Sequence, residues 1–244
     1  MAARVATSRK ARGAARSRGY RLVLEDDDLL VVEKDPGVLT VPAPSSPGDS
    51  LVDRLLEMYR SRGFRRPRLW VVHRIDRYTS GLVLFARREA AAARLIDMFR
   101  SRLVLREYLA ICHGIPRPAA ARLESRLVES PRSLKIGVTT DPRKGRLASC
   151  SYVTERALTR AALLRVTLET GVRNQIRVQL AEAGHPLVGD HTYGERSPLI
   201  GRVALHAARL GFSHPSTSRP VGIESRLPED MALLLKRLRR RSPP

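Results

Sequence analysis

The sequence has few cysteines and no motif that binds a nucleotide cofactor. Its 244 residues include only two cysteines, Cys112 and Cys150, each inside an apolar, strand-like run and neither in a CxxC pair. We therefore expect two small buried side chains in a reducing compartment. Neither GxGxxG nor GxxxxGK followed by Ser or Thr occurs, so the sequence predicts that the protein uses no cofactor.

Long apolar segments are also missing. No run approaches the ~18 residues that a membrane-spanning helix needs, and no secretory apolar core is present. We expect a cytoplasmic protein without a membrane partner, with organellar import as the alternative. Residues 1–20 are basic and contain no acid. They are expected to form an RNA-binding arm, because they lack the clear apolar face of the alternative, a transit peptide.

Acidic residues are scarce relative to basic ones. The chain has 45 Lys and Arg residues against 24 Asp and Glu residues, which gives a formal net charge of +21. A charge of this size attracts polyanions, and nucleic acid is the commonest of these partners. The alternative is a soluble protein with a charged surface. Hydrophobic residues make up 43% of the chain, enough for a real core.

Alternating and amphipathic patterns predict an α+β fold. We expect one catalytic domain over residues 21–241, built on a mixed, mostly antiparallel sheet flanked by helices. The run 21–41 predicts two strands around an acidic turn at 25–28. Further strands are expected at residues 69–72, 82–86, 104–114, 122–130, 146–158, 161–170 and 204–214. Helices are expected from residue 51, after a cap at Asp49 or Ser50, and at residues 88–102, 174–184 and 229–241.

The stretch HRIDRYTSG, residues 73–81, places one acid between two arginines at the junction of two apolar runs. Asp76 has two readings here. It is either half of a structural ion pair or a reactive carboxylate kept ionised by the positive charge of Arg74 and Arg77. A structural ion pair is the commoner case for an aspartate, and the position at a strand end, a rigid support for catalytic groups, supports the second interpretation.

A second polar stretch, residues 170–194, reads TGVRNQIRVQLAEAGHPLVGDHTYG. Its basic and amide side chains, Arg173, Gln175 and Arg177, lie at the predicted start of a helix. Such a position suits a phosphate or a carboxylate, and the alternative is an ordinary polar helix start.

Metal ligands are not supported by the same stretch. His185, Asp190 and His191 match no zinc spacing, and GHPLVGD has the residues of a loop. We expect no metal site.

Together these segments resemble the RluA-type pseudouridine synthases. HRIDRYTSG resembles that family's HRLDxxTSG motif, in which the Asp is catalytic. REYLAICHG, residues 106–114, resembles the K-x-Y-x-A strand, with Arg106 where Lys is usual and Tyr108 as the tyrosine. Residues 170–194 resemble TGRTHQIRVHLAxxGHPIxGDxxYG. The resemblance runs in order over about residues 21–235.

The resemblance implies an isomerase that converts uridine to pseudouridine in ribosomal or transfer RNA, acting as a monomer without a cofactor. It implies that Asp76 is the catalytic carboxylate, that Arg177 pairs with it, and that Tyr108 packs on the target base. The carboxylate either attacks C1′ or removes the C2′ proton. The target base leaves its stack, and Arg74 fills the space. The other residues expected to contact RNA or to shape the site are Arg77, Thr79, Ser80, Gly81, Gln175 and Ile176.

The sequence also departs from the family pattern. Val172, Arg173 and Asn174 replace the usual Arg, Thr or Lys, and His, and Gln179 replaces a common His. Only about 20 residues precede the core, so we expect no S4 RNA-binding module. Two rival functions stay open: an RNA-binding protein that has lost activity, and a hydrolase that cleaves the glycosidic bond.

Overall fold

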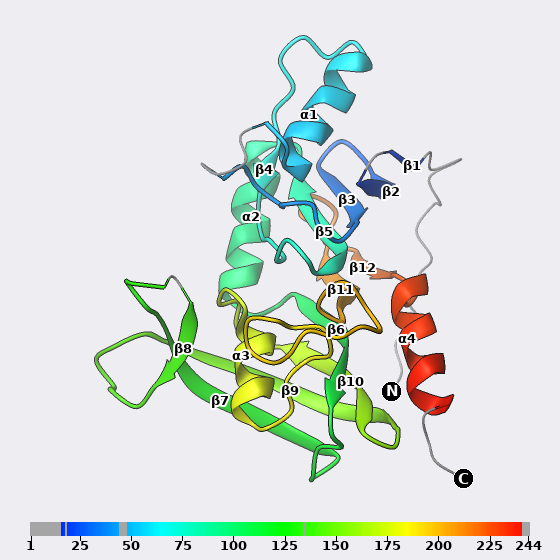
Figure 1. The fold of residues 1–244 in the computed structure, drawn as a ribbon. Helices are drawn as coiled ribbons and strands as arrows, with labels where there is room; N and C mark the ends of the chain where they lie inside the picture. The colour runs from blue at the N-terminus through cyan, green and yellow to red at the C-terminus, as the bar shows by residue number, and fades with distance from the viewer. Residues whose placement is uncertain (1–15, 18, 44–47, 134, 241–244) are drawn as a thin grey trace. The chain divides into compact units, whose positions relative to one another are not determined.

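The computed structural model describes residues 16–17, 19–43, 48–133 and 135–240 (Figure 1), and the chain divides into two compact units. Unit 1 comprises Met1–Leu105 and Ala207–Ser225, and unit 2 comprises Arg106–His206 and Arg226–Pro244. Both units contain helices and strands, so the expected α+β class is confirmed. The expected N-terminal arm lies outside the described residues except for positions 16–17 and 19–20.

Unit 1 combines two helices with a set of mostly short strands. Its elements are β1 (Arg16–Ser17), β2 (Tyr20–Glu25), β3 (Leu29–Lys34), α1 (Leu51–Ser61), β4 (Trp70–Val71), β5 (Ser80–Ala86), α2 (Glu89–Arg100), most of β11 (Leu205–Ser213) and β12 (Pro220–Glu224). The strand order is β1-β2-β3-β5-β11, with β4 paired to β5 and β12 to β11. The β2–β3 and β3–β5 pairings are antiparallel, as expected.

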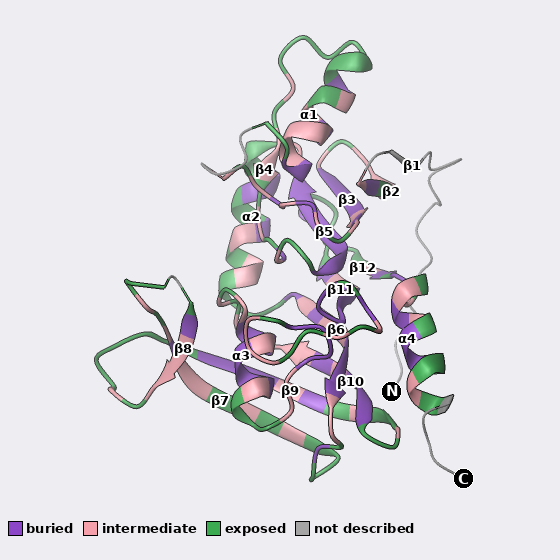
Figure 2. Ribbon diagram, in the orientation of Figure 1, coloured by how far each residue is buried: buried purple, intermediate pink, exposed green. Residues whose placement is uncertain are grey.

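The core of unit 1 lies along β3 and β5. All seven residues of β5 are buried, because this strand has neighbours on both edges and side chains over its faces (Figure 2). Helix α2 contributes Ala91, Ala92 and Leu95 to the apolar cluster that includes Leu82 and Leu84. The alanine-rich helix therefore supports the strand that begins just after Asp76.

Helix α1 begins at the predicted cap. The Ser50 hydroxyl accepts a hydrogen bond from the Asp53 amide at 3.2 Å, and the Asp53 carboxylate accepts one from the Ser50 amide at 2.9 Å. This reciprocal pair satisfies two amides that helix geometry leaves without partners. One side of the helix buries Leu51, Leu55 and Tyr59.

Unit 2 contains an antiparallel sheet and two helices. Its elements are β6 (Leu105–His113, from Arg106 on), β7 (Ala120–Glu129), β8 (Ile136–Thr139), β9 (Arg146–Ala157), β10 (Ala161–Leu168), α3 (Gln175–Glu182) and α4 (Glu229–Arg240). The strand order is β6-β10-β9-β7-β8, and each of these pairings is antiparallel.

Helix α3 covers one face of this sheet near β7 and β9. The Gln179 amide donates to the Ser125 hydroxyl and the Ala148 carbonyl, both at 3.0 Å, and its oxygen accepts from the Cys150 thiol at 3.3 Å. Val178 joins an apolar cluster with Ala148. The glutamine that replaces the family's common histidine is thus a buried link between α3 and the sheet.

Helix α4 packs elsewhere in unit 2. Its residues Met231, Leu234 and Leu235 are buried in a cluster with Ile111 and Leu163, as expected for an amphipathic helix. Within the described residues, neither α4 nor any other helix is both long enough and apolar enough to cross a bilayer.

Four short strands differ from the sequence prediction. The strand expected at 69–72 is only the two-residue β4, and Val71 is 38% exposed, so it is not a buried strand. It pairs only with the last two residues of β5, Phe85 and Ala86. Because β4 meets β5 at its end, the pairing extends over two residues and no further. β1, β8 and β12 were not predicted, because two to five residues hold too little alternation to define a strand.

Candidate functional site

Asp76 lies in the loop that joins β4 to β5. Its carbonyl accepts a hydrogen bond from the Thr79 amide at 3.1 Å, which closes a four-residue turn. Ile75, directly before it, is buried, whereas Asp76 itself is half-buried. The acid is therefore presented from a tight turn with an apolar anchor on one side.

The Asp76 turn is fastened by Lys34 from the end of β3. This lysine is fully buried, and its ammonium donates to the carbonyls of Asp35, Val38 and Arg77 at 2.9, 2.8 and 3.0 Å. Three hydrogen bonds occupy the three donors of an ammonium, which offsets the cost of burying the charge. Gly37 exchanges two further bonds of 2.8 Å with Arg77. The turn at residues 35–38 is thus bonded to the residue next to Asp76.

Further contacts fix the loop on the side that precedes Asp76. The Thr40 hydroxyl donates to the Ile75 carbonyl at 2.7 Å and accepts from the Ile75 amide at 3.3 Å. His73 accepts from the Leu84 amide at 2.9 Å, and its ring stacks on Phe99 with centroids 4.8 Å apart. The motif is therefore held by β3, β5 and α2 of the same unit.

The Thr-Ser-Gly that follows Asp76 is an interior segment. Thr79 and Ser80 are buried. Gly81 has a φ of +111°, and a Cβ atom there would lie 2.2 Å from the Ala207 carbonyl oxygen. Only glycine combines that backbone angle with so close an approach. These positions support the turn, and their predicted contact with RNA stays a prediction.

Arg74 and Arg77, on either side of Asp76, are exposed. Arg77 lies over the Tyr78 ring at 5.7 Å in addition to its bond to Gly37. Arg74 makes no hydrogen bond or ion pair within the described part of the chain. Its guanidinium is thus available to a ligand.

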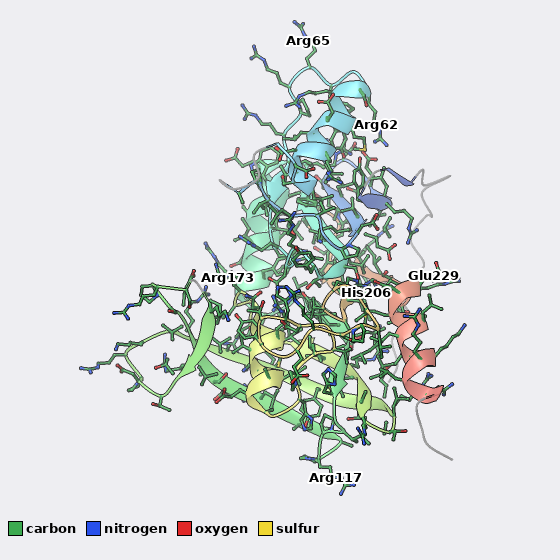
Figure 3. The ribbon with its side chains drawn as sticks, viewed as in Figure 1. Arg62, Arg65, Arg117, Arg173, His206 and Glu229 are labelled. Carbon is green, nitrogen blue, oxygen red and sulfur yellow. The ribbon has the colours of Figure 1, made fainter. Side chains whose placement is uncertain are left out.

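A second exposed basic segment follows α1 in unit 1. Arg65, Arg66 and Arg68 are exposed and have no ion pair with the residues that the structure describes. Arg65 extends outward from the loop (Figure 3). The nearby Phe64 is 48% exposed and packs edge-on against Tyr59. Free arginines beside an exposed ring suit a nucleic acid.

In unit 2, Tyr108 lies in β6 and is 7% exposed. Its register partner is Val166 of β10, which is itself paired with Tyr152 of β9. Residues in one row of a sheet share a face, and Cys150, two positions from Tyr152, contacts α3. Tyr108 therefore lies on the sheet face that carries α3.

Arg177 on α3 is held by a buried carboxylate. Its Nε and Nη2 donate to the two oxygens of Asp190, both at 2.7 Å, and its Nη1 donates to the Asn174 side chain at 2.9 Å. The Tyr193 ring lies 5.1 Å from the guanidinium carbon. Asp190 and Tyr193 were missed as site residues, although both belong to the quoted GHPLVGDHTYG stretch.

The ionisation of Asp190 follows from these contacts. Burial raises the pKa of its carboxyl, but hydrogen bonds and charge from Arg177, with the amides of Thr192 and Tyr193, more than offset this and lower the pKa. Asp190 is thus an anion at neutral pH and forms a bidentate ion pair with Arg177.

The remaining predicted residues of α3 are buried. Gln175 accepts from Thr170 and the Val172 amide at 2.8 and 3.1 Å and donates to the Ser149 carbonyl at 3.0 Å, so its polar atoms bond within unit 2. Ile176 is 3% exposed. An RNA contact by Gln175 stays a prediction, as does the role of Ile176 as an apolar wall.

Only one group of residues in the described part of the chain has metal-ligand geometry, namely Asp26, Asp28 and His214. His214 Nδ1 accepts from the Ser216 and Thr217 amides. The other ring nitrogen therefore carries the proton that reaches Asp26 at 3.1 Å, and it offers no lone pair to a cation. This group is a structural clamp in unit 1.

The predicted site residues divide between the units. Unit 1 holds Asp76 with its supporting turn, and unit 2 holds Tyr108, Ile176 and Arg177. The predicted pairing of Asp76 with Arg177 joins the two units and stays a prediction.

The chain matches known proteins over most of its length. Residues 28–182 match the family model described as RNA pseudouridylate synthase. The chain is 35% identical over 232 residues to ribosomal large subunit pseudouridine synthase D of Zymomonas mobilis, covering 89% of this chain and 72% of that protein. It is also 35% identical over 217 residues to YjbO of Bacillus subtilis, described as an uncharacterized RNA pseudouridine synthase, covering 88% and 75%.

Two solved human structures share the fold. RNA pseudouridylate synthase domain containing 4 aligns with a TM-score of 0.74 at 23% identity, covering 91% of this chain and 93% of the other. Domain containing 1 aligns with a TM-score of 0.67 at 24% identity, covering 92% and 96%.

Proposed function

Because the chain belongs to the RluA-type RNA pseudouridylate synthases, enzymes that isomerise uridine to pseudouridine in RNA, we propose that it isomerises specific uridines of structured RNA with Asp76 as the catalytic carboxylate. The observation that carries this proposal is the support around Asp76. A fully buried lysine, a threonine and a stacked histidine fix the turn that presents a half-buried acid. Such support is what a reacting group requires.

The reaction is an isomerisation and balances without a second reactant. The bond between N1 and C1′ breaks, a bond between C5 and C1′ forms, C5 loses a proton and N1 gains one. Asp76 acts at the ribose, either by attack on C1′ or by removal of the C2′ proton. Both routes need an ionised carboxylate.

The residues of unit 2 serve the base and the carboxylate. We assign Arg177 as the cation that pairs with Asp76 and keeps it ionised. Tyr108, buried on the sheet face that carries α3, packs on the uracil, and Ile176 closes the apolar side of the pocket. The rigid attachment of Arg177 to Asp190 supports this assignment.

The target uridine leaves its stack to reach the carboxylate. Unstacking a base costs roughly a few kcal/mol, and a planar guanidinium placed in the vacated space offsets part of that cost. Arg74 suits this role, because it is exposed, adjoins the Asp76 turn and has no partner within the described residues.

The RNA is ribosomal or transfer RNA. The Zymomonas relative is named for the ribosomal large subunit, which supports a uridine of ribosomal RNA as the target. Mapping pseudouridines in total RNA from cells with and without this protein identifies the site. If the only pseudouridine missing without the protein lies in a transfer RNA, that transfer RNA is the substrate.

One assay tests the proposed reaction against its rivals. Wild-type protein and Asp76→Asn are incubated with cellular RNA tritiated at uridine C5. We expect wild-type protein to release tritium and leave the RNA chain with all its bases. We expect the variant to bind RNA but release none, because a neutral amide cannot replace the carboxylate. Binding without release by wild-type protein would indicate an inactive RNA-binding protein, and free uracil would indicate a hydrolase.

We also propose that the enzyme works as a cytoplasmic monomer. Cys112 and Cys150 are free and buried, which suits a reducing compartment. Light scattering during size-exclusion chromatography should give the mass of one 27.2 kDa chain. A mass of twice that value would contradict the monomer.

A further inference from the structure

The guanidinium of Arg177 is fixed in one plane by its own unit. Asp190 receives two of its N–H groups at 2.7 Å and Asn174 receives a third at 2.9 Å. A guanidinium has five N–H donors in one plane. Three bonds therefore determine where the remaining two point.

Asp190 is built to hold that plane. Its side chain is fully buried, whereas that of Arg177 keeps 11% of its surface exposed. The carboxylate oxygen that meets Nη2 also accepts from the Thr192 amide at 3.0 Å and the Tyr193 amide at 3.3 Å. Backbone amides thus fix the carboxylate, and the carboxylate fixes the arginine. Of the two side chains, only that of Arg177 keeps exposed surface.

Two further side chains, Asn174 and Tyr193, contact Arg177. Asn174 has a φ of +56°, a left-handed conformation that asparagine tolerates better than most residues. Its side-chain nitrogen donates to the Tyr193 hydroxyl at 3.2 Å, and the Tyr193 ring lies against the guanidinium. The asparagine that replaces the family's usual histidine thus belongs to the shell around Arg177.

A buried ion pair of this kind is a poor source of stability. Removing two charges from water costs much of what their attraction returns. What the pair supplies is orientation, since a bidentate contact between arginine and a carboxylate sets both distance and plane.

We propose that Asp190 is the positioning residue for Arg177, fixing the guanidinium plane so that its remaining N–H groups meet the reacting carboxylate. The inference rests on the proposed function, in which Arg177 pairs with Asp76. Asp190 touches neither substrate nor reacting atoms in this scheme and acts through Arg177 alone.

The test compares single-turnover rates on RNA tritiated at uridine C5, with enzyme in excess and saturating. Asp190→Asn keeps the shape of the side chain but loses the charge and one acceptor oxygen. We expect its rate constant to fall roughly 100-fold, the scale of loss for a misplaced catalytic group, with RNA affinity within about twofold of wild type.

The matched control is Asp230→Asn. Asp230 forms another bidentate pair of unit 2, with Arg202, through bonds of 2.6 and 2.9 Å. Its loss should lower the melting temperature and leave the rate of the folded protein within about twofold. Circular dichroism establishes that each variant is folded at the assay temperature. A rate for Asp190→Asn within about threefold of wild type would overturn the inference.

Arg177→Lys tests the same claim by itself should Asp190→Asn fail to fold, and in combination with Asp190→Asn should that variant fold. Arg177→Lys keeps the charge but cannot make the bidentate contact, so we expect a comparable fall in rate. Adding Asp190→Asn to that variant should lower the rate little further, because one residue acts through the other. A near wild-type rate for Arg177→Lys, or full additivity of the two losses, would overturn the inference.

Failure of the proposed function gives a different result. Tritium release by wild-type protein, abolished in Asp76→Asn, establishes the reaction on which the inference rests. No release by wild-type protein would overturn both claims, whereas release that Asp190→Asn leaves unchanged would overturn the positioning role alone.

Discussion

At the scale of single residues, the most informative side chain is Lys34. A lysine with no exposed surface is rare unless it is paired, and here the buried ammonium donates to three backbone carbonyls. Two of these carbonyls belong to the turn after β3, and the third belongs to the residue after Asp76. One ammonium therefore couples an early turn of the chain to the candidate catalytic loop.

Replacing Lys34 by Met should destabilise the protein by about 3 kcal/mol, since the loss leaves the buried carbonyl of Val38 and the half-buried carbonyl of Asp35 without this donor. Urea unfolding of both proteins measures the difference. Lys236→Met, at an exposed position of α4, is the control and should change the free energy of unfolding by less than about 0.5 kcal/mol. Similar values for the two variants would remove Lys34 from this role.

The cysteines give a second residue-scale prediction. Burial raises the pKa of Cys112 to about 11 and that of Cys150 to about 12, so both thiols stay protonated at neutral pH. The thiolate is the reactive form. We expect native protein at pH 8 to resist iodoacetamide and protein in 6 M guanidinium to take up two labels, as measured by intact mass. Rapid labelling of the native protein would contradict their burial.

The sequence predicted the candidate site unevenly at this scale. Asp76 stood out because an acid between two arginines at a strand junction is unusual in a basic chain. Asp190 did not, because its only local context was two histidines and a loop, and a partner 13 residues earlier on a helix leaves no local pattern. Gln175 was predicted to contact RNA from a polar helix start, and no local pattern indicated that α3 buries it together with Ile176 and Val178.

At the scale of elements, the sequence predicted the helices and longer strands, whose apolar residues repeat at a regular spacing. It did not predict the short strands, which contain too few residues for such a repeat. The cap at Asp49 or Ser50 and the amphipathic pattern of residues 88–102 predicted two helices, since both signals act within a few turns. β8 has four residues and lies beside β7 alone. Pairing with β7 defines this strand, and the four residues of β8 alone hold too little alternation to predict it.

Gly81 tests how closely β5 and β11 approach. Gly81→Ala introduces a methyl group 2.2 Å from the Ala207 carbonyl oxygen at a φ of +111°. Gly37→Ala is the matched control, because its φ is +90° and nothing lies within 4 Å of the new atom. Both variants place alanine at an unfavourable positive φ, and only in Gly81→Ala does the new methyl group also clash with backbone atoms of Ala207.

We therefore expect Gly81→Ala to lose about 2 kcal/mol more stability than Gly37→Ala, the cost of overpacking a site that cannot move. Chemical denaturation of the two variants measures this difference. Equal losses would show that β11 yields at this point, and the glycine would then be needed only for its backbone angle.

At the scale of the whole molecule, charge governs both stability and partner. Burial raises the pKa values of Asp190 and Asp230, but their arginine partners more than offset this, and both pKa values are lowered. A lowered pKa in the folded state means that the unfolded state binds more protons in acid. These groups therefore contribute stability above a pH of about 4, which is lost as the pH falls further.

Urea unfolding between pH 6 and pH 2.5 should accordingly show a decline below pH 4 that is shallower in Asp230→Asn than in wild-type protein. The variant has one carboxyl fewer whose protonation weakens the fold. A decline of equal steepness would mean that the Arg202 pair does not couple folding to pH.

The loops on either side of β8 carry a cluster of positive charge in unit 2. Residues 132–146 hold five basic side chains and one acid, Asp141, which pairs with Arg143 and Lys144 at 3.5 and 3.6 Å. The Ile136 amide at the start of β8 donates to the Tyr193 hydroxyl at 3.1 Å. RNA held by these loops would thus lie beside the residues that enclose Arg177.

Changing Arg132, Lys135 and Arg146 to Ala should therefore weaken RNA binding and lower the slope of log affinity against log salt by about 2. The slope is measured by filter binding between 50 and 300 mM salt. A control triple variant removes the same charge at the opposite end of the sheet, at Arg117, Arg156 and Arg160, which are also exposed. It should change the slope by less than about 1, because within the described residues no side-chain hydrogen bond or ion pair joins those positions to Arg177, Asp190, Asn174 or Tyr193. Equal slopes for the two variants would mean that the net charge of +21, and not the β8 loops, directs the RNA.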